Sequence, residues 1–271
     1  MAETLTAIAE WRREAPRRAE QMAREWRLRL GRPYAPGVAG HVVRALCEDG
    51  SPAVLKLVWP HREAEQEADA LERWAGNGAV RLLARDDEQH ALLLERCEPG
   101  TTLAAAPDPV GVLVGLLPRL WVGGEGFRSL SDEAGHWLGG PGLAAVPDRR
   151  LREAAMHYLG ELAPSQGEPV LVHQDLHGDN VLAARREPWL AIDPKPLAGE
   201  REFGVAPIVR SSELGHSKRD VLYRLDRLTA ELGLDRDRAR GWTIAQTVAW
   251  MGGGDVIESH AETVRWLLED V

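Results

Sequence analysis

The spacing of apolar residues changes character along this chain of 271 residues. Residues 4–30 carry apolar side chains at roughly helical spacing, with Thr4 as a possible cap, and predict an amphipathic helix. Pro16 should divide or kink that helix. A loop rich in glycine and proline follows over residues 31–40. Short apolar runs between turn residues then predict four strands, at residues 41–46, 53–58, 80–85 and 90–97.

A helical segment at residues 61–75 interrupts these strands, and beyond Pro99-Gly100 the pattern becomes mainly helical. Residues 123–147 are rich in loop-forming residues and carry Trp137, and their pattern assigns them no role. The remaining sequence predicts helices at residues 110–122, 149–162, 218–232, 242–251 and 256–268. We therefore expect an α+β protein of two domains, residues 1–97 (with the helical extension 4–30) and residues 98–271.

A lysine in the second predicted strand suggests an ion pair. Lys56 is the only charged residue of residues 53–58. In the predicted helix that follows, Glu67 lies four residues before Leu71, on the face that should meet the sheet. Glu67 is therefore the expected partner of Lys56, with Glu63 as the alternative. A lysine at a sheet edge with its ammonium group in water is the other interpretation.

The stretch Leu171–Asn180, LVHQDLHGDN, places two histidines, two aspartates and an asparagine directly behind an apolar run, and Asp193 follows thirteen residues later in another apolar run. One interpretation is a polar turn whose aspartates cap neighbouring backbone groups. A second is phosphoryl transfer. A third is a two-metal hydrolase site with ligands that alternate along the chain, from His173, Asp175, His177 and Asp179.

Phosphoryl transfer needs a carboxylate that accepts a proton, an amide and a second carboxylate that bind Mg²⁺, and a lysine that holds the phosphates. In the kinase catalytic loop, H-x-D is followed by four residues and then asparagine, and His173, Asp175 and Asn180 have this spacing. Asp193 ends a short apolar strand, where the metal-binding aspartate belongs. Together with the expected lysine–glutamate pair, this order favours phosphoryl transfer over the other two interpretations.

Composition narrows the possible partners and location. The formal net charge is −9 and no basic cluster offers a path for a nucleic-acid backbone, so we expect no nucleic-acid partner. The N-terminus is interrupted by charges and no apolar run could span a membrane. Cys47 and Cys97 are the only cysteines, which favours a cytoplasmic protein over a disulfide framework. Lysine occurs only at Lys56, Lys195 and Lys218, so each lysine is of interest in this arginine-rich chain.

The quoted residues also carry a family resemblance. HQDLHGDNVLAARREPWLAIDPKP, with EADALERWAGNGAVRLLARDDEQHALLLERCEPGTTL upstream, closely resembles the aminoglycoside/hydroxyurea phosphotransferases, and most of all their streptomycin 6-phosphotransferases. The similarity covers about residues 35–215. It implies a bilobal protein-kinase-like fold, in which an N-terminal lobe with an antiparallel five-stranded sheet and helices is joined by an adenine-binding hinge to a mostly helical C-terminal lobe.

The resemblance implies roles for the residues of the central stretch. Asp175 matches the catalytic base, and Asn180 and Asp193 match the Mg²⁺ ligands. His173 matches the histidine that supports this loop.

The resemblance also implies a nucleotide site in the N-terminal lobe. Lys56 matches the lysine that holds the α- and β-phosphates of ATP, and Glu67 matches its helical partner. Glu95 and Cys97 fall at the hinge, where their backbone groups should hydrogen-bond adenine and their side chains should matter little.

The chain also departs from the family pattern. Gln174 stands where glycine is usual, and Gly204 stands where relatives often carry an aspartate that supports the catalytic loop. The loop at residues 31–41 is not the G-x-G-x-x-G of protein kinases. His177 occupies the position of a phosphate-facing lysine in many kinases, so a role near the γ-phosphate and a simple packing role are both open. Asp179 is expected to cap the loop.

The implied activity is ATP- and Mg²⁺-dependent phosphorylation of a hydroxyl group that inactivates a small cationic antibiotic, first of all the 6-hydroxyl of streptomycin. Hydroxyurea, another antibiotic or a small sugar metabolite is the alternative acceptor. A pseudokinase that only binds, and a metal-dependent hydrolase, are the alternatives from other classes. We expect a monomer with no membrane partner.

Overall fold

The structure is a computed structural model that describes residues 2–35, 40–251 and 257–270. By its internal contacts the chain divides into two compact units. The first unit combines Met1–Gly100 with Ala183–Leu190, and the second combines Thr101–Leu182 with Ala191–Val271. Among the described residues, no helix is both long and apolar enough to cross a membrane. The glycine run at 252–254 and part of the glycine-rich loop at 31–40 lie outside the described residues.

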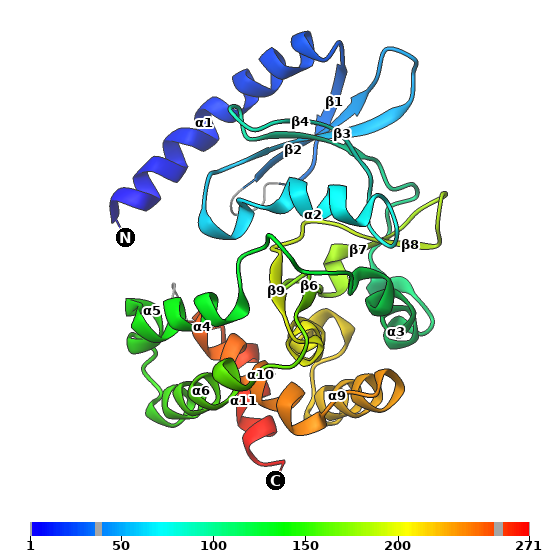
Figure 1. Cartoon of the computed structure of the whole chain (residues 1–271). Coiled ribbons are helices and arrows are strands. Elements are labelled where there is room, and N and C mark those ends of the chain that lie inside the picture. The colour runs from blue at the N-terminus through cyan, green and yellow to red at the C-terminus, as the bar shows by residue number, and fades with distance from the viewer. Residues whose placement is uncertain (1, 36–39, 252–256, 271) are drawn as a thin grey trace. The chain divides into compact units, whose positions relative to one another are not determined.

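A five-stranded antiparallel sheet in the order β1-β2-β3-β5-β4 forms the centre of the first unit, as expected (Figure 1). The strands are β1 (Arg29–Pro33), β2 (Gly40–Leu46), β3 (Pro52–Val58), β4 (Leu82–Asp86) and β5 (Ala91–Glu95). Four of them match the predicted apolar runs. The assignment of residues 29–33 to a helix end and a loop is wrong. The sequence of β1, RLGRP, carries one large apolar side chain, so the alternation typical of a strand could not be recognised. Pairing with β2 defines this strand.

The N-terminal helix α1 (Ala2–Glu25) lies along one face of this sheet (Figure 1). Pro16 lies inside it and does not divide it into two helices. One stripe of the helix is buried against apolar side chains of β2, β3 and β5, and consists of Trp11, Ala15, Ala19 and Met22. Burial of this stripe offsets the backbone hydrogen bond that Pro16 cannot make.

The central strand β3 separates two environments. Its odd-numbered residues in 53–57 belong to the core that α1 covers, so Lys56 points to the opposite face, where it meets α2 (Glu67–Trp74). The single helix predicted at 61–75 is in fact a 3₁₀ turn, η1 (Arg62–Ala64), followed by α2.

Helices dominate the second unit. They are α3 (Pro109–Leu120), α4 (Leu130–Gly139), α5 (Pro141–Ala144), α6 (Arg149–Leu162), α7 (Arg201–Gly204), α8 (Ala206–Val209), α9 (Lys218–Leu232), α10 (Arg236–Met251) and α11 (Glu258–Leu268). α6 and α9 have the predicted bounds. Residues 123–147, which are rich in loop-forming residues, contain α4 and α5 as well as loops. Trp137 of α4 is buried with its ring 6.3 Å from that of Phe203, a contact that spacing along the chain does not reveal.

Short strands frame the central loop. β6 (Val170–Val172) pairs with β9 (Leu197–Gly199), and η4 (Gly178–Asn180) leads from the loop into β7 (Val181–Ala183), which pairs with β8 (Trp189–Ala191). The segment between β8 and β9 returns beside the loop. There Ile192 N–H donates to the Asn180 carbonyl at 2.9 Å, and Lys195 N–H donates to the His173 carbonyl at 3.0 Å.

Candidate active site

The loop after β6 is anchored by His173, which is 3% exposed. Its Nε2 donates to the Ile192 carbonyl at 2.9 Å, and its Nδ1 accepts the backbone N–H of Asp175 at 3.4 Å. Burial lowers the pKa of His173 to about 4, so the ring is neutral near pH 7 and can make both bonds at once. These contacts agree with the supporting role expected for this histidine.

The structure shows how the loop accommodates Gln174, the first departure from the family pattern. Its φ of 63° lies in the left-handed region that favours glycine, which is a physical reason for glycine at this position in relatives. The Gln174 carbonyl accepts a hydrogen bond from Gln246 Nε2 of α10 at 2.9 Å. Gln246 accepts in turn from Arg210 Nη1 at 2.5 Å. Buried side chains of the helical unit therefore hold the strained loop backbone.

The surroundings of Gly204 explain the second departure, the absence of an aspartate at this position. A Cβ atom at this position would lie 3.1 Å from Trp121 Nε1 and 3.5 Å from Val172 Cγ1. An aspartate would therefore require Trp121 to move. Gln246 supports the loop through the Gln174 carbonyl, so the missing aspartate does not leave the loop without support.

In the described part of the chain, two cationic side chains approach the carboxylate of Asp175. Lys195 Nζ donates to Asp175 Oδ2, and Arg210 Nη2 lies 3.7 Å from Oδ1. Arg210 itself is buried and stacks on the Trp250 ring, with its guanidinium carbon 4.4 Å from the centroid. The two cations offset the cost of placing the Asp175 carboxylate in a largely buried position.

Asn180 and Asp193 offer oxygen atoms suited to Mg²⁺. Asn180 Nδ2 donates to the Asp175 carbonyl at 2.8 Å, which leaves Oδ1 as the amide atom that can bind a cation. Asp193 has a φ of 57°, and its side chain is 43% exposed with Oδ2 3.8 Å from Lys195 Nζ. An amide oxygen and a carboxylate are the hard ligands that Mg²⁺ prefers. The donor set fits this ion, and the binding itself stays a prediction.

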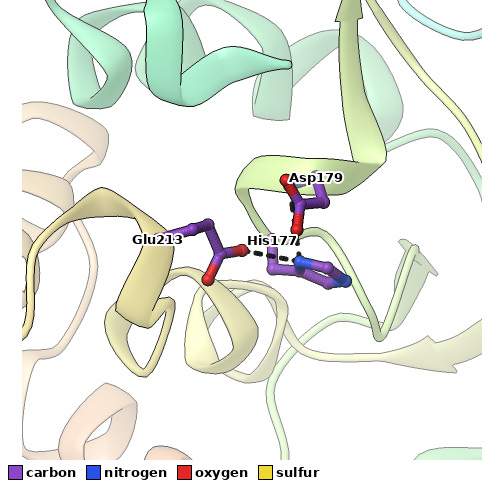
Figure 2. Close-up of side chains that lie close together, drawn as sticks. All are labelled: His177, Asp179 and Glu213. Atoms are coloured by element: carbon purple, nitrogen blue, oxygen red, sulfur yellow. Dashed lines mark hydrogen bonds and ion pairs between the residues drawn. The ribbon is translucent and has the colours of Figure 1, made fainter.

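His177 and Asp179 approach Glu213 of η5 (Ser212–Leu214), as Figure 2 shows. The His177 Nδ1 lies 2.6 Å from Glu213 Oε1, and the Asp179 N–H lies 3.4 Å from the same nitrogen. The ligand atoms of these three side chains lie within 4.8 Å of one another, which suits one cation as well as an ion pair. His173 and Asp175 make their contacts elsewhere, so the four ligands of the two-metal interpretation do not converge.

The His177–Glu213 pair depends on pH in a defined direction. Burial opposes the charge of His177, but the hydrogen bond to Glu213 raises its pKa above 6.5. Burial also opposes the charge of Glu213, and the bond to His177 still holds its pKa at about 2 instead of 4.5. Glu213 therefore contributes stability above pH 4.5 that is lost as the pH falls toward 2. His177 contributes stability below pH 6.5 that is lost as the pH rises through its raised pKa.

The substitution Glu213→Gln is expected to lower the free energy of unfolding most at about pH 5.5, where both partners are charged, and less at about pH 9, because His177 loses its proton as the pH rises through its raised pKa. Urea denaturation at the two pH values measures the difference. Glu153→Gln on the exposed face of α6 is the control and should show little change at either pH. A loss that is equal at both pH values would contradict the ion pair.

Arg224 positions the segment that carries Arg210 and Glu213. Its guanidinium is buried and donates four hydrogen bonds of 2.8 to 3.1 Å to backbone carbonyls near both ends of residues 209–215. Burial lowers its pKa to about 10, which still leaves it charged near pH 7. The segment is therefore tied to α9, and the side chains of Arg210 and Glu213 are held against the loop.

The predicted contact between Lys56 and Glu67 is confirmed. Lys56 Nζ lies 2.6 and 2.7 Å from the two carboxylate oxygens of Glu67, and the residues are 7% and 3% exposed. Glu67, the first choice of the two glutamates, is thus a partner of Lys56. The ammonium group thus has a defined position on the α2 side of the sheet.

The expectation that the Glu95 side chain matters little needs correction. Its carboxylate accepts two hydrogen bonds from Arg186, at 2.8 and 2.9 Å, and a third from the Arg81 N–H at 3.1 Å. Arg186 also donates to the carbonyls of Gly76 and Ala79. These bonds tie the β7–β8 turn to the sheet, which explains why Ala183–Leu190 belongs to the first unit.

Cys97 follows this carboxylate in the chain and is partly buried. Burial, with the negative charge of Glu95, raises the pKa of its thiol to about 12. The thiol is therefore protonated and unreactive near neutral pH, as expected for a structural cysteine.

Sequence reasoning missed several residues that the structure brings to the central loop, namely Lys195, Arg210, Glu213 and Gln246. Lys195 had one signal, because lysine is so rare in this chain. The other three lie more than 30 residues from the loop residues that they contact and carry no local pattern.

Comparison with known proteins identifies the family. Residues 26–252 match the family described as aminoglycoside/hydroxyurea antibiotic resistance kinase. The chain is 40% identical to the hydroxyurea phosphotransferase of Kitasatospora aureofaciens over 245 residues, 86% of this chain and 71% of the relative. It is 41% identical to the streptomycin 6-kinase of Streptomyces glaucescens over 258 residues, 89% of this chain and 84% of the relative.

Solved structures agree on the fold. A thermostable mutant of aminoglycoside phosphotransferase APH(4)-Ia, in a ternary complex with ADP and hygromycin B, is similar with a TM-score of 0.64 and 13% identity, over 93% of this chain and 95% of that chain. Choline kinase LicA from Streptococcus pneumoniae is similar with a TM-score of 0.65 and 13% identity, over 92% and 95%. The fold is thus protein-kinase-like, and the chain belongs to the aminoglycoside/hydroxyurea antibiotic resistance kinases, a family of phosphotransferases.

Proposed function

We propose that this enzyme transfers the γ-phosphate of ATP to a hydroxyl group of a small cationic antibiotic and thereby inactivates it. The observation that carries the proposal is the position of Asp175. His173 holds its backbone, its carboxylate lies among cations, and the oxygen ligands of Asn180 and Asp193 belong to the same unit. Phosphoryl transfer requires such a carboxylate near metal-bound phosphates.

The proposal also gives a role to the nucleotide-binding residues of the first unit. Lys56, held in place by Glu67, contacts the α- and β-phosphates, and the backbone at Glu95 and Cys97 binds adenine. The ADP in the APH(4)-Ia complex supports nucleotide binding in this fold. When bound by Asn180 and Asp193, Mg²⁺ would neutralise phosphate charge.

Asp175 aligns the acceptor hydroxyl and accepts its proton. The hydroxyl oxygen forms a bond to the γ-phosphorus as the bond from that phosphorus to the β–γ bridging oxygen breaks. The electron pair of the broken bond leaves with ADP. Asp175 later releases the proton to water, so the products are a phosphate ester, ADP and a proton.

Streptomycin, phosphorylated at its 6-hydroxyl, is the first proposed acceptor. Two streptomycin 6-kinases, of Streptomyces glaucescens and Streptomyces griseus, are each 41% identical to this chain. Hydroxyurea is the alternative, because a hydroxyurea phosphotransferase is 40% identical. The net charge of −9 favours a cationic acceptor by long-range attraction.

We also propose a role for each lobe, an oligomeric state and a location in the cell. Residues 1–97 act as the nucleotide-binding lobe, and residues 98–271 supply catalysis and the acceptor site. The enzyme acts as a cytoplasmic monomer, without nucleic-acid or membrane partners.

A coupled ADP-release assay with Mg²⁺-ATP tests the proposed function on a panel of streptomycin, other aminoglycosides and hydroxyurea. We expect turnover with streptomycin, a product whose mass has increased by one phosphoryl group, and loss of turnover when EDTA removes Mg²⁺. Position-specific NMR of the product identifies the hydroxyl that was modified.

Turnover of hydroxyurea and of no other compound on the panel would identify hydroxyurea, and not streptomycin, as the acceptor. ADP release without a phosphorylated product, or no activity on the entire panel, would contradict antibiotic phosphorylation and direct the search to small sugar metabolites.

A further inference from the structure

Lys195 lies beside both carboxylates to which the proposed function gives a chemical role. Its Nζ donates to Asp175 Oδ2 and is 3.8 Å from Asp193 Oδ2, and its side chain is 20% exposed. Its backbone N–H is fixed on the His173 carbonyl at 3.0 Å, and prolines restrict the chain on either side of it. The backbone of Lys195 is therefore held in place, and its ammonium group lies within 4 Å of both the proposed catalytic base and a proposed metal ligand.

We propose that Lys195 is a catalytic residue that binds the γ-phosphate of ATP and stabilises its charge during transfer. This inference rests on the proposed function. In the structure, the Lys195 ammonium donates to the Asp175 carboxylate. The negative oxygens of the γ-phosphate attract it when ATP binds, which leaves Asp175 able to accept the hydroxyl proton.

The two cations near Asp175 differ in freedom of movement. Arg210 is buried, hydrogen-bonded to Gln246 and stacked on Trp250, so its guanidinium is held in one position. Lys195 has a flexible four-carbon stem and is partly exposed. Lys195 is therefore the cation that can follow an incoming phosphate, while Arg210 remains with Asp175.

The side chain of His177 is not placed to bind the γ-phosphate next to Asp175. His177 stands where many kinases carry a phosphate-facing lysine, but its Nδ1 is bonded to Glu213 at 2.6 Å, which fixes the ring on the η5 segment. Lys195 reaches Asp175 from the segment between β8 and β9 instead. The cation that lies beside Asp175 Oδ2 thus comes from a different segment than His177.

The residue type supports the same role. This chain uses arginine at nearly every cationic position, and Lys195 is one of only three lysines. A planar guanidinium would tend to bind both oxygens of Asp175 and block the base. An ammonium is a compact charge with rotating donors, so it can be shared between a carboxylate and a phosphate.

Equilibrium binding of two nucleotides tests the proposal without any acceptor. Lys195→Met and the wild type are titrated with ADP and with AMP-PNP, both with Mg²⁺, by calorimetry. We expect Lys195→Met to bind AMP-PNP at least about tenfold more weakly while ADP affinity changes less than about threefold, because only AMP-PNP carries the γ-phosphate. Steady-state kcat should fall by about 10²–10³-fold, as for the loss of one charge-stabilising donor.

Two further variants distinguish the effect of losing the Lys195 charge from an effect of poor folding. Lys195→Arg keeps the charge and should recover part of the AMP-PNP affinity even if the methionine variant is poorly folded. Lys218→Met removes a lysine of α9 that pairs with Glu269 on the surface, and should leave both affinities unchanged.

An unchanged ratio of AMP-PNP to ADP affinity in Lys195→Met would overturn the proposal, even if stability and kcat fell, because it would show that Lys195 only neutralises Asp175. If the wild type phosphorylates an antibiotic while this ratio stays unchanged, the proposed function stands and the role of Lys195 falls. If the ratio changes as expected but no antibiotic is phosphorylated, the γ-phosphate site stands and the acceptor assignment fails.

Discussion

Asp175→Asn is expected to lower kcat by about 10²–10⁴-fold, the usual contribution of a general base. Asparagine has nearly the same shape, but its amide cannot accept the hydroxyl proton. The backbone N–H of residue 175 still bonds His173, so the loop conformation should persist. Lys195 and Arg210 lose a charged partner, which should destabilise the fold by about 1–2 kcal/mol without unfolding it. Single-turnover phosphorylation and urea denaturation measure the two effects separately.

Asp179→Asn is the matched control, because Asp179 lies in the same loop, is exposed, and has its carboxylate near His177 and Glu213. Its kcat should stay within about threefold of the wild type. If Asp175→Asn kept most of the wild-type rate, or if the control lost as much activity, Asp175 would not be the base.

Lys56→Met is expected to damage both stability and catalysis, for different reasons. Loss of the ammonium removes the Lys56 partner of the buried Glu67 carboxylate, which should lower the free energy of unfolding by about 3–5 kcal/mol. Loss of the phosphate contact should lower kcat/KM for ATP by about 10²–10³-fold. Denaturant unfolding and initial rates at varied ATP concentration measure the two effects.

A double variant separates these effects. Lys56→Met with Glu67→Met removes both charges and fills the space with apolar side chains, which should restore stability to near the wild-type value. The activity should stay as low as in the single variant. Recovery of activity together with stability would show that Lys56 serves only the fold, and would remove it from the nucleotide site.

Local patterns were sufficient for several features of this protein. The bounds of α6 and α9 follow from helical periodicity with caps at Asp148 and Ser217. The Lys56–Glu67 pair follows from strand alternation combined with the helical repeat. Local patterns did not reveal β1, which has few apolar residues, or α4, which contains two glycines. Neighbouring segments stabilise both elements.

The sequence by itself determined the order of the elements, the His173–Asp175–Asn180 spacing and the ion pair behind the sheet, because these depend on neighbours a few residues apart or on simple periodicity. Only the tertiary structure decided what surrounds Asp175. Lys195 is 20 residues away along the chain, and Gln246 is 72 residues from the carbonyl that it holds. No local propensity encodes such contacts, because they arise when α10 and the segment between β8 and β9 pack against the loop.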